Sequence, residues 1–184
     1  MPLREIAYTI LPSADSTLAI EIFKTGLMRK KKHILFFENF SGELAYVPEH
    51  PEASRIHMQV DVSSVVCRDQ WLKRKKQMAV AEYVKRQGLR AEQHPEIRFT
   101  SNRISPKPLR GFVVEGVLEI AKTTRVVKVN VVMNPRKNGS FQIDGDTNIC
   151  LSDFGIKPPS SMFGLSGAKD EGLIRILLWA TPAT

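Results

Sequence analysis

Few side chains of this sequence combine the residue types and spacings that metal binding requires. A zinc site typically pairs two Cys or His ligands close in sequence with two more farther along the chain. The histidines and cysteines show no such spacing, among themselves or with one another. They are His33, His50, His57, His94, Cys67 and Cys150. We therefore predict no metal site.

The acidic and nucleophilic side chains give no clearer sign of catalysis. Asp144 and Asp146 share one face of a predicted strand, but no second acidic pair lies nearby, and a solvated outer face explains them. Asp153-Phe154-Gly155 matches the magnesium-binding tripeptide of protein kinases, yet the other kinase motifs are missing. No Ser or Cys has a recognisable nucleophile context. The sequence predicts a protein that is not an enzyme and has no catalytic residues.

Two basic clusters, Arg29–Lys32 and Lys73–Lys76, carry eight positive charges, which equals the formal net charge of +8. A pI near 9.7 favours phosphate-bearing partners: nucleic acid, anionic lipid headgroups or a diphosphate ligand. Nucleic acid is the less favoured partner, because single-strand binding uses exposed aromatic rings between the basic residues and Trp71 is expected to pack under a helix. The lysines predicted to meet a phosphate or diphosphate headgroup are Lys30, Lys31, Lys73 and Lys76.

Most of the chain alternates apolar and polar residues with the period of two that is typical of β-strands. Asn138-Gly139 predicts a hairpin turn, and Pro159–Gly172 predicts a long loop. The predicted strands are Ile6–Leu11, Ser16–Lys24, His33–Phe37, Ser41–Val47, Arg55–Val66, Glu96–Ile104, Gly111–Ala121, Thr124–Met133, Ser140–Leu151 and Glu171–Thr181.

One segment, near residues 69–87, lacks Pro and Gly and is rich in helix-forming residues. Asp69 is the predicted N-cap or first-turn acid, and Gly88 the predicted stop. The pattern as a whole predicts a mainly β protein, an antiparallel barrel or sandwich with one helical insertion. The apolar strand faces form either a packed core or the wall of a ligand cavity, and alternation does not distinguish the two.

The 184 residues predict a single domain over residues 1–184. The N-terminal residues do not form the basic start and apolar core of a secretory signal, and no apolar run is long enough to span a bilayer. We expect a cytoplasmic protein, and two cysteines fit that compartment. The sequence leaves open whether Cys67 and Cys150 form a disulfide.

Several short motifs resemble the YceI-like family, whose members are lipid- and polyisoprenoid-binding proteins. The motifs are His94-Pro95-Glu96-Ile97-Arg98-Phe99-Thr100-Ser101, Val114-Glu115-Gly116-Val117-Leu118-Glu119-Ile120, Asp153-Phe154-Gly155-Ile156, Arg68-Asp69 and Phe40-Ser41-Gly42. The resemblance extends in the same order from about Tyr8 to Trp179. It implies an eight-stranded, antiparallel, lipocalin-like β-barrel with one helix inserted near residues 69–87.

The sequence also departs from the family's pattern. Trp71 stands where many members have a histidine, and the segment between Arg68 and His94 is longer and more basic. An early Ser-x-Val-x-Phe motif is reduced to Ser16-Thr17-Leu18-Ala19-Ile20. These departures lie near the expected mouth of the tunnel, so they concern the ligand more than the fold.

The leading hypothesis is non-enzymatic binding, storage or transport of an apolar or amphipathic lipid in a barrel tunnel, with an isoprenoid or quinone-type lipid as the bound molecule. Peripheral contact with an anionic membrane and a homodimer are compatible with the sequence. The alternative is a basic β-barrel with a packed interior that binds nucleic acid or another anionic partner on its surface. The predicted tunnel residues are Ile20, Phe37, Met58, Val60, Phe99, Phe112, Val114, Leu118, Val129, Val131, Phe141, Ile143 and Ile176.

Overall fold

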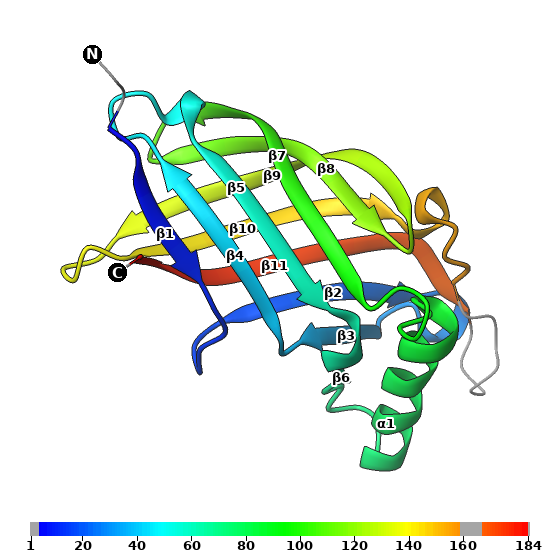
Figure 1. Cartoon of the computed structure of the whole chain (residues 1–184). Helices are drawn as coiled ribbons and strands as arrows, with labels where there is room; N and C mark the ends of the chain where they lie inside the picture. Colours follow the sequence, from blue (N-terminus) through cyan, green and yellow to red (C-terminus); the bar gives the residue numbers. More distant parts are fainter. Residues whose placement is uncertain (1–3, 159–166, 184) are drawn as a thin grey trace.

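The computed structural model describes residues 4–158 and 167–183, in which eleven strands form one antiparallel sheet. Eight of these strands close into a ring in the order β1-β4-β5-β7-β8-β9-β10-β11, and β11 pairs back onto β1 (Figure 1). The ring strands are β1 (Ile6–Ile10), β4 (Phe40–Tyr46), β5 (Arg55–Asp61), β7 (Glu96–Lys107), β8 (Gly111–Ile120), β9 (Thr123–Pro135), β10 (Phe141–Cys150) and β11 (Ala168–Pro182). The predicted eight-stranded antiparallel barrel is confirmed.

The remaining strands branch from the ring at β11, the longest strand. Its last residues pair with β1, with Ile10 opposite Ala180, whereas its earlier part pairs with β2. From there the sheet continues through β2 (Thr17–Lys24), β3 (Lys32–Phe37) and β6 (Val65–Cys67). One edge of β11 is therefore shared by two partners, and the barrel widens where β2 replaces β1.

The helix covers the wide end. It comprises α1 (Arg74–Tyr83) and a π-helical turn at Val84–Gly88, and it lies beside β6 at the lower right of Figure 1. The predicted helix is confirmed, but it begins at Arg74 and not near Asp69. The reason is that the Asp69 carboxylate accepts the backbone N–H of Ile34 and therefore does not cap the helix.

Two further predictions differ from the structure. Arg55–Val66 is not one strand, because a 3₁₀ turn at Val62–Ser64 separates β5 from β6, and the Asp61 carboxylate accepts the Ser63 N–H there. The predicted loop Pro159–Gly172 is too long, because β11 begins at Ala168, opposite Lys24. Residues 159–166 of that loop lie outside the described residues.

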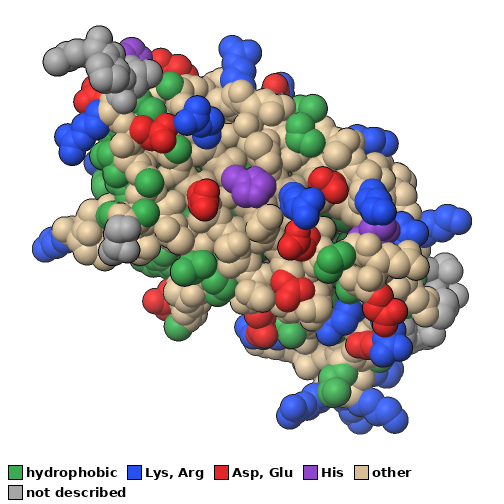
Figure 2. Space-filling view, viewed as in Figure 1, with side chains coloured by type: hydrophobic (Ala, Val, Ile, Leu, Met, Phe, Trp, Pro, Cys, Tyr) green, Lys and Arg blue, Asp and Glu red, His purple; other side chains and the backbone are tan. Residues whose placement is uncertain are grey.

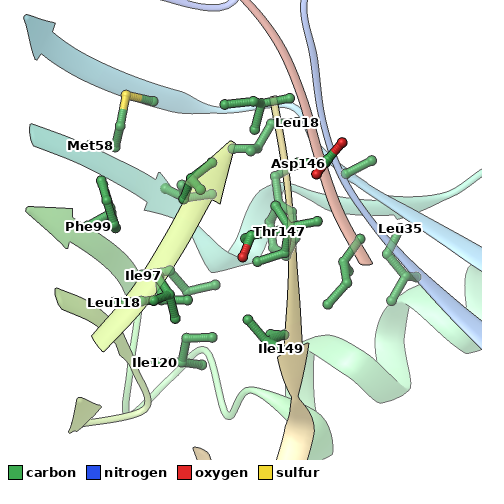
Figure 3. Close-up of a pocket in the computed structure, with 18 of the residues that line it drawn as sticks. Leu18, Leu35, Met58, Ile97, Phe99, Leu118, Ile120, Asp146, Thr147 and Ile149 are labelled. Atoms are coloured by element: carbon green, nitrogen blue, oxygen red, sulfur yellow. The ribbon is translucent and has the colours of Figure 1, made fainter. Parts of the chain in front are cut away.

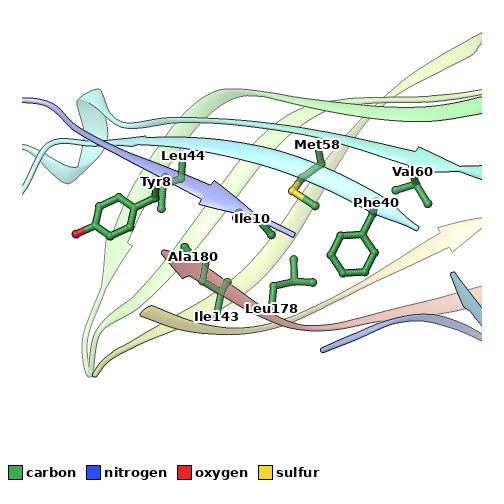
Figure 4. Close-up of a cluster of buried hydrophobic side chains, with 9 residues drawn as sticks. All are labelled: Tyr8, Ile10, Phe40, Leu44, Met58, Val60, Ile143, Leu178 and Ala180. Atoms are coloured by element: carbon green, nitrogen blue, oxygen red, sulfur yellow. The ribbon is translucent and has the colours of Figure 1, made fainter. Parts of the chain in front are cut away.

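Apolar side chains pack differently at the two ends. The closed end, where β1 meets β11, is filled by the cluster in Figure 4: Tyr8, Ile10, Phe40, Leu44, Met58, Val60, Ile143, Leu178 and Ala180. The α1 end is covered by apolar residues of the helix, of β3 and β6 and of the segment before the helix: Leu35, Val65, Cys67, Leu72 and Val80. Between them the ring strands enclose the space described next.

Two smaller findings complete the fold. Cys67 is buried, Cys150 is exposed, and both are free thiols. None of the helices in the described part of the chain has the length and apolar character needed to traverse a bilayer.

Candidate functional site: an apolar cavity with one buried lysine

A cavity of about 250 Å³ lies inside the barrel, close to the lower limit of the range of about 300–1,000 Å³ typical of ligand pockets (Figure 3). Its lining comes from seven of the eight ring strands, from β2 and β3, and from the helix. On β8 alone the lining runs from Phe112 to Ile120, which corresponds to about 27 Å of extended chain. A modest volume spread over that length is a narrow tunnel, with the width of a single extended chain.

Glycines on the inward face keep the tunnel open by letting large neighbours lie flat against the wall. A Cβ at Gly116 would lie 2.6 Å from the Phe99 ring, and one at Gly145 would lie 2.9 Å from the Ile176 side chain. Both large residues line the cavity. Without room above the glycines, these side chains would have to project farther into the lumen.

The structure places twelve of the thirteen predicted tunnel residues in the cavity lining: Ile20, Phe37, Met58, Val60, Phe99, Phe112, Val114, Leu118, Val129, Val131, Ile143 and Ile176. Phe141 lies elsewhere, at the closed end. Its ring centroid is 5.3 Å from that of Tyr8 and 5.4 Å from that of Tyr46. Contact of any of these side chains with a ligand stays a prediction.

The four lysines predicted to bind a headgroup, Lys30, Lys31, Lys73 and Lys76, are exposed and do not line the cavity. Figure 2 shows Lys and Arg side chains gathered over α1, at the bottom right of the view. The lysines that do line the cavity are the exposed Lys157 and the buried Lys24. A headgroup role for the four surface lysines stays a prediction.

Lys24 was missed by the sequence interpretation, although its signal is present. On β2 the inward row is Leu18, Ile20 and Ile22, and Lys24 is the next residue in that row. It is only 2% exposed. Burial lowers the pKa of the Lys24 ammonium below its usual value.

Beside Lys24 lies a buried polar cluster of His33, Cys67 and Asp69. His33 Nδ1 is 2.7 Å from Asp69 Oδ2, and since a carboxylate only accepts, Nδ1 carries the proton. His33 and Asp69 are 36 residues apart, so no local spacing could have shown the pair.

The cluster is a structural network in this chain. Desolvation raises the pKa of the Cys67 thiol to about 12, so the free thiol stays protonated at neutral pH. Asp69 meanwhile connects β3 to the segment before α1 through its bonds to His33 and to the Ile34 N–H. The arrangement positions His33 in the cavity wall.

These features define an antiparallel β-barrel with an internal apolar cavity. The YceI-like domain model matches residues 8–178, and the chain belongs to that family. A comparison with curated protein sequences gives no match.

Solved structures share the fold. BcnA of Burkholderia cenocepacia is 22% identical, with a TM-score of 0.74 over 91% of this chain and 98% of that one. A polyisoprenoid-binding domain from Saccharophagus degradans is 11% identical, with a TM-score of 0.65 over 95% and 98% of the two chains. The YceI protein of Campylobacter jejuni is 17% identical, with a TM-score of 0.62 over 82% and 85%.

Proposed function

We propose that this protein binds an apolar or amphipathic lipid of isoprenoid type inside the barrel, for storage or transport, without catalysing a reaction. The observation that carries the proposal is the narrow, apolar tunnel. Burying about ten methylene-sized units at about 0.8 kcal/mol each supplies about 8 kcal/mol, which corresponds to micromolar affinity. Such a site needs few polar contacts, in agreement with its lining.

The comparisons are consistent with an isoprenoid guest, and a quinone-type lipid is the second candidate. The chain belongs to the YceI-like family, and one structural neighbour is described as a polyisoprenoid-binding domain. The direct test is organic extraction of the purified protein followed by mass spectrometry. We expect a single-chain or isoprenoid lipid in stoichiometric amount. Repeated extraction of protein that contains no lipid, together with failure to take up added lipid, would contradict the proposal.

A matched pair of variants on β9 tests the tunnel itself. Val129 lines the cavity, whereas Val126, on the opposite face of the same strand, is 62% exposed. Val129→Arg places a charge in the tunnel and should abolish lipid uptake, whereas Val126→Arg should leave it unchanged. Circular dichroism checks that both variants fold. Equal uptake by the two variants would place the lipid outside the barrel.

The alternative, surface binding of nucleic acid, differs in its response to salt. Phosphate contacts on a surface weaken steeply with added salt, whereas apolar burial does not. We expect lipid binding to be nearly constant between low and moderate salt. A steep loss of binding would favour the alternative.

A membrane is the expected source of the lipid. Leu27 is 97% exposed and precedes the basic cluster Arg29–Lys32, and basic residues near an exposed apolar side chain favour an anionic bilayer surface. We expect co-sedimentation with vesicles that contain phosphatidylserine and little with pure phosphatidylcholine. Equal binding to both kinds of vesicle would show that the basic clusters do not direct the protein to a membrane.

A further inference from the structure

Lys24 has an unusual environment for a lysine. Its residue is 2% exposed and lines the apolar cavity, and its side-chain ammonium makes no hydrogen bond or ion pair with any described residue. Buried lysines are normally paired, because removing an ammonium group from water is costly. Residues 159–166 contain no Asp or Glu, so that segment supplies no acidic side chain.

The nearest acidic residue on the same strand does not serve Lys24. Glu21 lies on the outer face of β2, where one carboxylate oxygen is 2.6 Å from Lys32 Nζ and the other is 3.0 Å from Arg175 Nε. Its charge is therefore already balanced by two cations. Glu21 is therefore engaged on the outer face, and no described acidic residue pairs with Lys24 on the inner face.

A second polar group of the lining lies close to Lys24. His33 is opposite Ile22 on the neighbouring strand, and Lys24 N–H donates to Lys31 O, so Lys24 and His33 are diagonal neighbours on the inward face. Diagonal pairs have their Cβ atoms within about 7–8 Å. Because His33 Nδ1 is held by Asp69, its Nε2 is the nitrogen left for a guest.

The other buried polar groups of the lining are already engaged. Thr147 Oγ1 is 2.8 Å from Lys128 O, and Ser54 Oγ accepts the Val47 N–H at 2.9 Å. Lys24 and His33 therefore stand out among the buried polar residues of the lining, since the acidic lining residue Asp146 is exposed, and the lining toward Tyr46 and Met133 is mostly apolar.

We propose that Lys24, with His33 beside it, binds the anionic headgroup of a single-chain lipid, a carboxylate or a phosphate, while the tail extends through the tunnel toward the closed end. This inference rests on the proposed function, and it assigns the charge of the bound lipid and its orientation in the tunnel. One ammonium without a partner among the described residues balances one negative charge, so a headgroup with a single charge fits best. A bound anion gives Lys24 a partner that none of the residues in 4–158 and 167–183 provides.

The test compares ligands with one tail and different heads. Palmitate, hexadecanol and hexadecyl phosphate each displace nile red from delipidated, full-length protein, and the affinities follow from the titrations. We expect palmitate or hexadecyl phosphate to bind at least about tenfold more tightly than hexadecanol, since a charged hydrogen bond supplies that much. Whichever of palmitate and hexadecyl phosphate binds more tightly identifies the preferred anionic group, a carboxylate or a phosphate.

Three variants connect this preference to Lys24. Lys24→Met keeps the side-chain length and should remove the preference while hexadecanol still binds. Lys24→Arg should retain the preference for the anionic ligands, because arginine keeps the positive charge. Lys169→Met is the matched control, because Lys169 follows the cross-strand partner of Lys24, Ala168, and is exposed. Lys169→Met should bind the three ligands with the same affinities as the unsubstituted protein.

The outcomes separate the two proposals. Binding of all three ligands with equal affinity, unchanged in Lys24→Met, overturns the headgroup assignment and leaves tunnel binding intact. Binding of none of them, nile red included, overturns the proposed function itself. Loss of nile red binding in Lys24→Met alone would also count against a headgroup role, because it would show that Lys24 maintains the tunnel and does not select its guest.

Discussion

The two ends of the barrel are built from the same kinds of strands, yet one is sealed and the other holds polar groups. At the closed end, β1 pairs with β11, and the rings of Tyr8, Tyr46 and Phe141 pack at steep angles with centroids 5.3–6.4 Å apart. At the α1 end, β2 takes the place of β1, and Lys24 and His33 face the interior. Closure of the barrel and the position of its polar residues therefore change with the strand that pairs with β11.

The cause lies in the pairing of β11. Where β1 pairs with β11 and closes the ring, side chains from facing strands meet and fill the interior, as in an eight-stranded barrel. Where β2 pairs with β11 instead, the sheet continues through β3 and β6, and the helix lies against β6. Lys24 and His33 line the cavity at that end.

The largest expected effect is at the closed end. Ile10 is 0% exposed, so Ile10→Ala should lower the free energy of unfolding by about 2–5 kcal/mol. Ile22→Ala, which shortens a half-buried side chain of the cavity wall, should cost only about 1 kcal/mol. Urea unfolding measures both. Equal losses would mean that the tunnel is packed as tightly as the closed end.

The next effect is at the α1 end. Asp69→Ala leaves His33 Nδ1–H and Ile34 N–H without their acceptor and should cost about 2–3 kcal/mol. Asp61→Ala is the control, because Asp61 also accepts a backbone N–H but at an exposed position, and should cost about 1 kcal/mol. Comparable losses for the two variants would contradict a buried structural network.

A smaller effect is a pH dependence from Lys24. Its pKa is lowered in the folded protein, so between that value and 10.5 the unfolded chain binds more protons. The free energy of unfolding should therefore rise with pH in this window, relative to Lys24→Met. Taking the difference between the two proteins cancels the opposite slope of Cys67, whose raised pKa reduces stability from pH 9.0 to about 12. A flat difference would mean that Lys24 is solvated.

The last prediction concerns the reactivity of the two thiols. Cys150 is exposed and Cys67 is buried beside the helix, so one thiol should react in the native protein and both after unfolding. Mass spectrometry of the modified peptides identifies the site. Labelling of Cys67 at the rate of Cys150 would show that the α1 end opens readily.

Much of the barrel follows from residue patterns. Alternation along β8 and β9 predicts both strands and their inward faces, which is why Val114 and Val129 lie in the cavity as expected. Phe141 obeys the same alternation but lies beyond the cavity, because alternation assigns a face and not a position along the barrel axis. Lys24 could have been found by noticing a cation in an apolar row.

Other features had no local signal. The His33–Asp69 contact joins two segments that only the pairing of β2, β3 and β6 brings together. The late start of the helix has the same origin, since Asp69 satisfies β3 and therefore does not act as a cap.

Residue patterns alone predict the strands, the face that each strand buries and the existence of a helix, because these depend on periodicity and local preference. The folded chain adds that the apolar faces enclose a tunnel, that β11 is shared by two partners, and that one lysine inside has no partner among the described residues. Those properties depend on distances between strands far apart in the chain, and a pattern of alternating residues contains no information on such distances.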